Sequence, residues 1–281
     1  MADADVRFAD RIRDSAGWNQ TLQDWQRLLR HDPAGCFVAE WNGRPAGTAT
    51  TTIYSQDLAW IGMVLVDPDL RRRGIGTALL QHGIEHLRGA GVGCIKLDAT
   101  PLGRQVYGPL GFVAEWSLSR WQTAELAGSP ARSDIPAAPG SQPPDSGGLG
   151  CIAELDAAAF GVTRNRMLST LAAQSQTLVR KDGTGRIVGY GMLRPGQRAH
   201  YLGPMVAEDE SSGIALADDL LGRLPGLPVY WDIPDANHAA IRIARRYGMD
   251  RQRTLTRMYL GENTRPGRPA ALWAIAAPEI G

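Results

Sequence analysis

The chain has 281 residues, a formal net charge of +1 and a sequence pI of about 7.8. Balanced charge offers no general attraction to nucleic acid or to an anionic membrane surface, so we expect neither as a partner. No apolar run approaches the roughly 20 residues of a membrane span, and the polar, acidic start does not resemble a signal peptide. We therefore expect a cytoplasmic chain of more than one domain, with its scattered cysteines reduced.

The first half is predicted to run strand, two helices, hairpin, and then strand, helix, strand, helix, strand. A helix is expected within residues 17–30, where Thr21 suits the N-cap and Asp24 stands three residues later. The hairpin is expected to turn at Asn42-Gly43, a dipeptide that favours tight two-residue turns.

The most informative segment is Arg-Arg-Arg-Gly-Ile-Gly-Thr-Ala at residues 71–78, between an apolar strand at residues 60–66 and a helical pattern. The unpaired N–H groups and the dipole of a helix N-terminus favour an anion. Gly74 and Gly76 let a phosphate approach the backbone closely, and the arginines add paired donors. The segment therefore predicts a site for a phosphate-bearing cofactor.

Two known phosphate-binding patterns do not fit this turn. A P-loop needs Lys and then Ser or Thr after its second glycine, but Gly76 is followed by Thr77-Ala78. The dinucleotide fingerprint needs a third glycine, where this chain has Leu79.

The spacing of Arg71, Gly74 and Gly76 resembles motif A of the GNAT superfamily of acyl-CoA-dependent N-acyltransferases. Residues 64–68, 97–100 and 107–112 resemble further segments of that family, in the same order. The resemblance covers roughly residues 4–122. It implies an α/β (α+β) fold in which helices flank a mixed, mostly antiparallel sheet, with acetyl-CoA as co-substrate and no metal.

The resemblance also implies roles for individual residues. Tyr107 matches the proposed general acid of the family, and Asp98 is a candidate general base at the end of a strand. A cap or loop hydrogen bond is an equally open reading of Asp98, and a water chain or a residue of the second half is an open alternative for the base. The residues expected to bind the cofactor are Val64, Leu65, Val66, Arg71, Arg72, Arg73, Gly74, Ile75, Gly76, Thr77 and Thr100, the last standing where many relatives have Asn.

The acceptor pocket is implied to lie along the first two helices, which here means residues 17–21 and Trp25. The candidate acceptor-binding residues are Trp18, Asn19 and Trp25. A tryptophan can hold a flat or cationic ligand. Packing in the core is the alternative reading of both tryptophans.

The second half resembles a copy of the first. Gly111 corresponds to Gly248, and Leu65-Val66 corresponds to Met205-Val206. Where the first copy has three arginines, the second has Glu210-Ser211-Ser212, and an acid there would repel a pyrophosphate. We therefore expect a catalytic domain at residues 1–122, a Gly/Pro/Ser-rich linker at 123–150, and a degenerate GNAT-like domain at 151–281, in a monomer or homodimer.

The leading functional prediction is an acetyl-CoA-dependent N-acetyltransferase that acts on the primary amine of a small molecule in a ternary complex. The alternatives are an acyl-CoA-binding sensor without turnover, an acyltransferase for longer acyl chains, and one that acts on a protein N-terminus.

Overall fold

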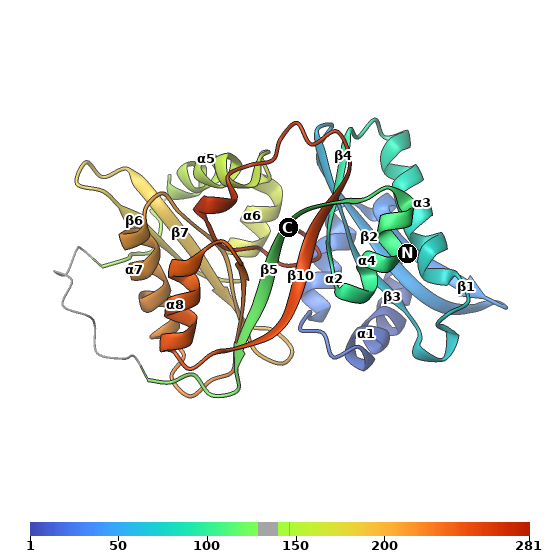
Figure 1. Ribbon diagram of the computed structural model, residues 1–281, viewed down its shortest axis with the longest axis horizontal. Coiled ribbons are helices and arrows are strands. Elements are labelled where there is room, and N and C mark those ends of the chain that lie inside the picture. Colours follow the sequence, from blue (N-terminus) through green and yellow to red (C-terminus); the bar gives the residue numbers. More distant parts are fainter. Residues whose placement is uncertain (129–139, 146) are drawn as a thin grey trace. The chain divides into compact units, whose positions relative to one another are not determined.

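The protein is described by a computed structural model over residues 1–128, 140–145 and 147–281 (Figure 1). Part of the predicted linker lies outside these described residues. The chain forms two compact α/β units, each with a mixed sheet flanked by helices. Unit 1 comprises Met1–Glu115, Thr256–Arg265 and Pro278–Gly281, and unit 2 comprises Trp116–Leu255 and Pro266–Ala277.

Most of unit 1 comes from the first half of the sequence. Its helices are α1 (Val6–Ser15), α2 (Leu22–His31), α3 (Ile75–Gly89) and α4 (Pro101–Tyr107), with short 3-10 turns at Asp3–Asp5, Pro33–Gly35, Pro68–Leu70 and Gly108–Leu110. Its strands are β1 (Cys36–Trp41), β2 (Arg44–Ser55), β3 (Leu58–Val66) and β4 (Cys94–Ala99), joined by the second part of β10 (Asp250–Gly261).

The sheet of unit 1 has the order β1-β2-β3-β4-β10, in which β3 and β4 are parallel and the other pairs antiparallel. The predicted hairpin is confirmed as β1 and β2 with its turn at Asn42-Gly43. The predicted cap is also confirmed, because Thr21 and Asp24 form a capping box at the start of α2. The initial strand predicted for the first half was wrong, since the chain begins with a 3-10 turn and α1.

Unit 2 repeats this arrangement with the second half of the sequence. Its helices are α5 (Gly148–Phe160), α6 (Asn165–Ala172), α7 (Glu210–Leu221) and α8 (His238–Arg246), with a 3-10 turn at Pro269–Ala271. Its strands are β5 (Val113–Thr123), β6 (Gln176–Lys181), β7 (Ile187–Arg194), β8 (His200–Ala207), β9 (Val229–Pro234) and β11 (Leu272–Ala274), together with the first part of β10. The order is β10-β5-β9-β8-β7-β6, and β11 pairs with β8.

The units differ from the contiguous segments expected from the sequence because the two halves exchange strands. In unit 1, Thr256–Gly261 of β10 pairs antiparallel with Ala99–Cys94 of β4. In unit 2, Leu118–Thr123 of β5 pairs with Pro234–Val229 of β9. The described ends of the predicted linker are also ordered, since Leu126 is buried in the core of unit 2 and Gln142 bridges to Val179.

The core of each unit lies between the sheet and its helices. Alternate residues of β3 and β4 pack against the apolar stripe of α3 in unit 1, and Leu80 and Leu87 there have no exposed surface. In the part of the chain that the structure describes, no helix combines the length and apolar character needed to cross a membrane.

Candidate functional site

The basic turn of unit 1 connects the end of β3 to the start of α3. Gly74 is the N-cap of α3 and has φ = +80°, a conformation that glycine adopts without strain. Apart from Gly74 itself, its two chain neighbours and the nearby backbone of α3, no atom of the described residues lies within 4 Å of the point where a Cβ on Gly74 would stand. The side chains of Arg71, Arg72 and Arg73 are exposed around this open backbone, so the turn presents cationic groups and N–H donors to an anion.

The strand that leads into this turn separates from its neighbour. Within the described residues, the register joins β3 to β4 at two positions, Ala59↔Ile95 and Trp60↔Lys96. Beyond them Met63 has φ = +49°, and its carbonyl oxygen accepts a hydrogen bond of 2.9 Å from the buried Thr48 hydroxyl. The register thus leaves the edge of β3 at residues 64–66 without β4 as a partner, next to the start of α3.

Tyr107 ends α4, and its half-buried ring packs beside Phe112. Burial raises the pKa of the phenol above its usual value of 10, since the charged form is penalised. Among the described residues, none is found to hydrogen-bond to its hydroxyl. The side chain therefore keeps its proton at neutral pH and has donor capacity left for a ligand.

Asp98 lies on β4 and is occupied by an ion pair. Its two carboxylate oxygens accept hydrogen bonds from Arg257 Nε and Nη2, both at 2.9 Å, and its side chain has 0% exposure. Arg257 also lies over the ring of Trp60, 4.5 Å from its centroid. The prediction that Asp98 is a base did not include this ion pair with Arg257. A carboxylate whose two oxygens both accept hydrogen bonds from a guanidinium is a poor proton acceptor.

The remaining predicted residues differ in burial, since Thr100 and Trp18 are partly exposed whereas Asn19 and Trp25 are buried. Thr100 caps α4, where its hydroxyl accepts a hydrogen bond from the Gly103 N–H at 3.1 Å. Trp18 is half-buried and Asn19 is buried, both in the loop between α1 and α2. Trp25 has 0% exposure and belongs to the core, which agrees with the alternative reading of that residue.

The equivalent site in unit 2 is filled by the chain itself. Met205 and Val206, which correspond to Leu65 and Val66, pair with Ala274 and Leu272 of β11. A Cβ on Gly213, at the start of α7, would lie only 2.0 Å from the ring of Trp273. In unit 2, β11 and Trp273 thus occupy the space beside this strand end and helix start.

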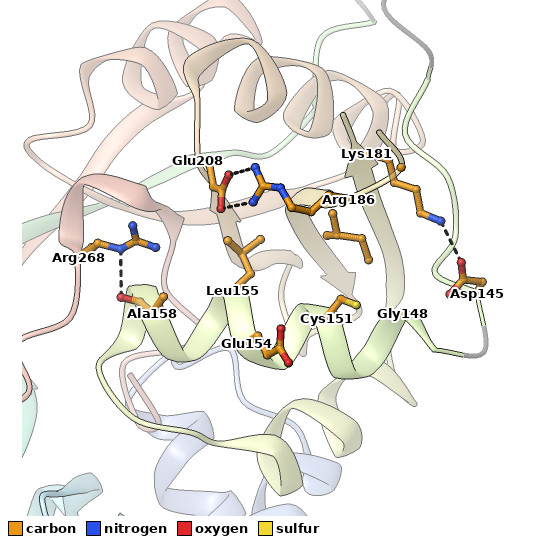
Figure 2. A pocket seen from close by; sticks show the side chains of 12 residues that line it. Asp145, Gly148, Cys151, Glu154, Leu155, Ala158, Lys181, Arg186, Glu208 and Arg268 are labelled. Atoms are coloured by element: carbon orange, nitrogen blue, oxygen red, sulfur yellow. Dashed lines mark hydrogen bonds and ion pairs between the residues drawn. The ribbon is translucent and has the colours of Figure 1, made fainter. Parts of the chain in front are cut away.

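A separate cavity of about 360 Å³ lies in unit 2 (Figure 2). Four of its charged side chains form two ion pairs, Arg186 with Glu208 at 2.7 Å and Lys181 with Asp145 at 2.9 Å, and Glu154 and Arg268 also line it. Cys151 lies among them with an exposed thiol. The cavity shares no lining residue with the basic turn.

Both halves match the same family. Residues 5–112 match the acetyltransferase (GNAT) family, and residues 152–274 match an acetyltransferase (GNAT) domain. The holothin acyltransferase of Pseudoalteromonas sp. (strain SANK 73390) is 25% identical over 267 residues, which cover 94% of this chain and 87% of the relative. A mycothiol acetyltransferase of Thermomonospora curvata is 32% identical over 108 residues, 37% of this chain and 36% of that protein.

Solved structures show the same fold over the whole chain. A protein from Pyrococcus horikoshii has a TM-score of 0.83 at 23% identity, covering 100% of this chain and 94% of the other. A tandem GNAT protein from the clavulanic acid biosynthesis pathway has a TM-score of 0.62 at 19% identity, covering 92% of this chain and 95% of that one.

These matches define an acyltransferase with two domains of one type in tandem. The chain belongs to the GNAT family of acetyltransferases, and the resemblance seen in its sequence is confirmed. Members of this family in general use acetyl-CoA as co-substrate.

Proposed function

We propose that unit 1 transfers an acetyl group from acetyl-CoA to the primary amine of a small molecule, by direct attack in a ternary complex. The observation that carries this proposal is the open turn at Gly74, with its exposed arginines, beside the unpaired edge of β3. The turn would hold the pyrophosphate, and residues 64–66 would pair with the pantetheine arm. Thr77 and Ile75, in the first turn of α3, would add backbone N–H donors.

The residues of unit 1 suit the chemistry of amide formation from a thioester. The amine nitrogen attacks the carbonyl carbon, the C–S bond breaks, and the leaving thiolate needs a proton. Tyr107 would supply that proton, since burial keeps the phenol protonated. Backbone N–H groups of β3 beyond Trp60 would stabilise the oxyanion of the intermediate.

The acceptor is inferred to be a small molecule. The mycothiol acetyltransferase and the holothin acyltransferase are relatives whose names specify such acceptors. The balanced net charge of +1 also offers no general attraction to a nucleic-acid-bound target.

The direct test of this function is thiol release from acetyl-CoA and from longer acyl-CoAs, measured with a panel of small amines and with peptides that carry a free N-terminus. We expect acetyl-CoA and at least one small amine to give turnover. Release with long acyl chains only, or with peptides only, would contradict the proposal. Tight binding of acetyl-CoA without release across the panel would indicate a sensor instead.

The substitution Gly76→Ala is expected to weaken acetyl-CoA binding without harming the fold. Its backbone is helical, and the new methyl would lie 3.4 Å from Val66 Cγ2, an ordinary contact distance. Alanine in place of glycine inside a helix stabilises it by roughly 0.5–1 kcal/mol. The methyl would nevertheless keep a phosphate from the backbone, so the Kd of acetyl-CoA should rise by about tenfold, or about 1.4 kcal/mol, in a calorimetric titration.

Gly89→Ala is the matched control for this prediction, because Gly89 ends the same helix and has nothing within 4 Å of a Cβ. We expect it to leave the Kd unchanged. Equal affinity of both variants would contradict a phosphate site at the turn.

The filled site of unit 2 predicts a single acetyl-CoA per chain. Leu272 and Ala274 take the backbone partners that a pantetheine arm would need, and Trp273 abuts Gly213. Isothermal titration should therefore give a stoichiometry of one, and a variant with Arg71, Arg72 and Arg73 changed to alanine should lose most of that binding. A stoichiometry of two would show that the second site is open in solution.

A further inference from the structure

The last four residues of the chain, Pro278–Gly281, belong to unit 1, whereas Pro266–Ala277 before them belong to unit 2. The carbonyl oxygen of Pro278 accepts a hydrogen bond from Trp60 Nε1 at 2.9 Å. The carbonyl oxygen of Ile280 accepts one from the Tyr54 hydroxyl at 2.7 Å. Because these donors stand on β3 and β2, the backbone on both sides of Glu279 is fixed against the sheet of unit 1.

Glu279 meets β3 at the point where that strand leaves β4. The Glu279 carbonyl oxygen and Cα lie 2.5 and 2.7 Å from where a Cβ on Gly62 would stand, so only glycine allows this approach. Gly62 comes two residues after Trp60, the last position shared with β4, and directly before Met63 with its positive φ. The tail therefore lies beside the part of β3 where the acyl group is proposed to sit.

The Glu279 side chain is 4% exposed and accepts a hydrogen bond of 2.6 Å from Gln20 Nε2. Gln20 belongs to the loop between α1 and α2, which the family resemblance places along the acceptor pocket. Its other amide atom, Oε1, is buried and has no hydrogen-bond partner among the described residues. A carboxylate and an unsatisfied amide oxygen thus stand side by side.

Further unsatisfied acceptors lie on the same face of the sheet. Thr50 pairs with Gly62 and Thr52 pairs with Trp60, and directly paired residues of antiparallel strands share a face. Both threonines are at most 1% exposed, and within the described part of the chain their hydroxyl oxygens have no partner. Buried polar atoms without partners are rare, and several of them on the face of the sheet against which Glu279 packs fit a ligand that brings several N–H donors.

A primary ammonium group has this chemistry, because it carries three N–H donors and a positive charge. We propose that Glu279 and Gln20 bind the amine of the acceptor in unit 1, and that the Glu279 carboxylate takes a proton from it. The inference rests on the proposed function and gives it a base other than Asp98, whose carboxylate is held by Arg257.

Glu279 and Tyr107 together account for the protons that move during the proposed reaction. The ammonium gives one proton to Glu279 and becomes a nucleophilic amine. Its lone pair forms the C–N bond, and the C–S bonding pair leaves with sulfur. The nitrogen loses a second proton as the amide forms, Tyr107 protonates the thiolate, and one proton in total passes to solvent.

The test compares Glu279→Gln, Glu279→Asp and the wild type as full-length chains, using the most active amine from the acceptor panel. Glu279→Gln keeps the size of the side chain and removes its charge. We expect its kcat/KM for the amine to fall by roughly 100-fold or more, with loss of the acidic limb of the pH profile. The Kd of acetyl-CoA and the melting temperature should stay the same, and Glu279→Asp should recover part of the activity.

Glu262→Gln is the matched control, since Glu262 is an exposed carboxylate of the same unit and should leave kcat/KM unchanged. If Glu279→Gln keeps kcat/KM within twofold and the same pH profile while the wild type turns over, the inference is overturned and the proposed function stands. If the wild type acetylates no amine of the panel, both fail together. A fall in the acetyl-CoA affinity or in the melting temperature of Glu279→Gln that accounts for its lost activity would assign the residue a structural role and overturn the inference.

Discussion

Replacement of Tyr107 by phenylalanine is expected to lower kcat by about 10²–10⁴, the range contributed by a positioned acid. The ring contact with Phe112 is retained, so the fold and the Kd of acetyl-CoA should not change. The loss should therefore appear in kcat with any active amine, measured by thiol release. Acetyl-CoA titration of the same variant separates chemistry from binding.

The pH dependence of the wild type follows from the same group. The pKa of Tyr107 is raised above 10 by burial, so the protonated acid is present throughout the physiological range and is lost only at more alkaline pH. We expect no fall in kcat due to this group below about pH 10. Tyr259→Phe, on β10 in the same unit, is the control and should be fully active. Turnover of Tyr107→Phe at the wild-type rate would remove Tyr107 from the mechanism.

Replacement of Asp98 by alanine is expected to lower the free energy of unfolding by about 3–5 kcal/mol, the range for breaking a buried ion pair. The reason is that the buried Arg257, whose side chain is 4% exposed, would lose the carboxylate that accepts two of its hydrogen bonds. Denaturant unfolding monitored by tryptophan fluorescence measures this loss. We expect the surviving folded fraction to bind acetyl-CoA normally.

An exposed ion pair of the same unit provides the control. Asp57 and Arg265 lie 3.2 Å apart with side chains 49% and 59% exposed, and Asp57→Ala should cost less than about 1 kcal/mol. Asp98→Asn distinguishes stability from catalysis, because it keeps the shape but removes the charge. An Asp98→Asn chain that unfolds like the wild type yet lacks turnover would restore Asp98 as a base.

Local features of the fold could be predicted from the sequence because the residues that form each of them lie close together in the chain. Thr21 and Asp24 cap one helix within three residues, and Asn42-Gly43 closes its own hairpin. The turn at Gly74 could be placed for the same reason, since the strand, the turn and the helix are consecutive.

Features that depend on distant contacts could not be predicted in this way. From the sequence alone, Asp98 is a polar residue near the end of a strand. Its ion-pair partner Arg257 lies on β10, 159 residues later in the chain. Glu279 carries no local pattern, and its neighbours Gln20 and Gly62 come from the other end of the chain. The spacing of residues in the sequence does not reveal such pairs, whereas the absence of arginines at Glu210-Ser211-Ser212 predicts that the first half binds the cofactor.

The strand exchange bears on why the degenerate second copy persists. Thr256–Gly261 completes the sheet of unit 1 next to β4, and Arg257 within it neutralises Asp98. A gene fragment that encodes only residues 1–122 would therefore lack a strand, a counter-ion and the tail that carries Glu279. Selection on unit 1 therefore also acts on these segments of the second half, so that half cannot be lost as one piece.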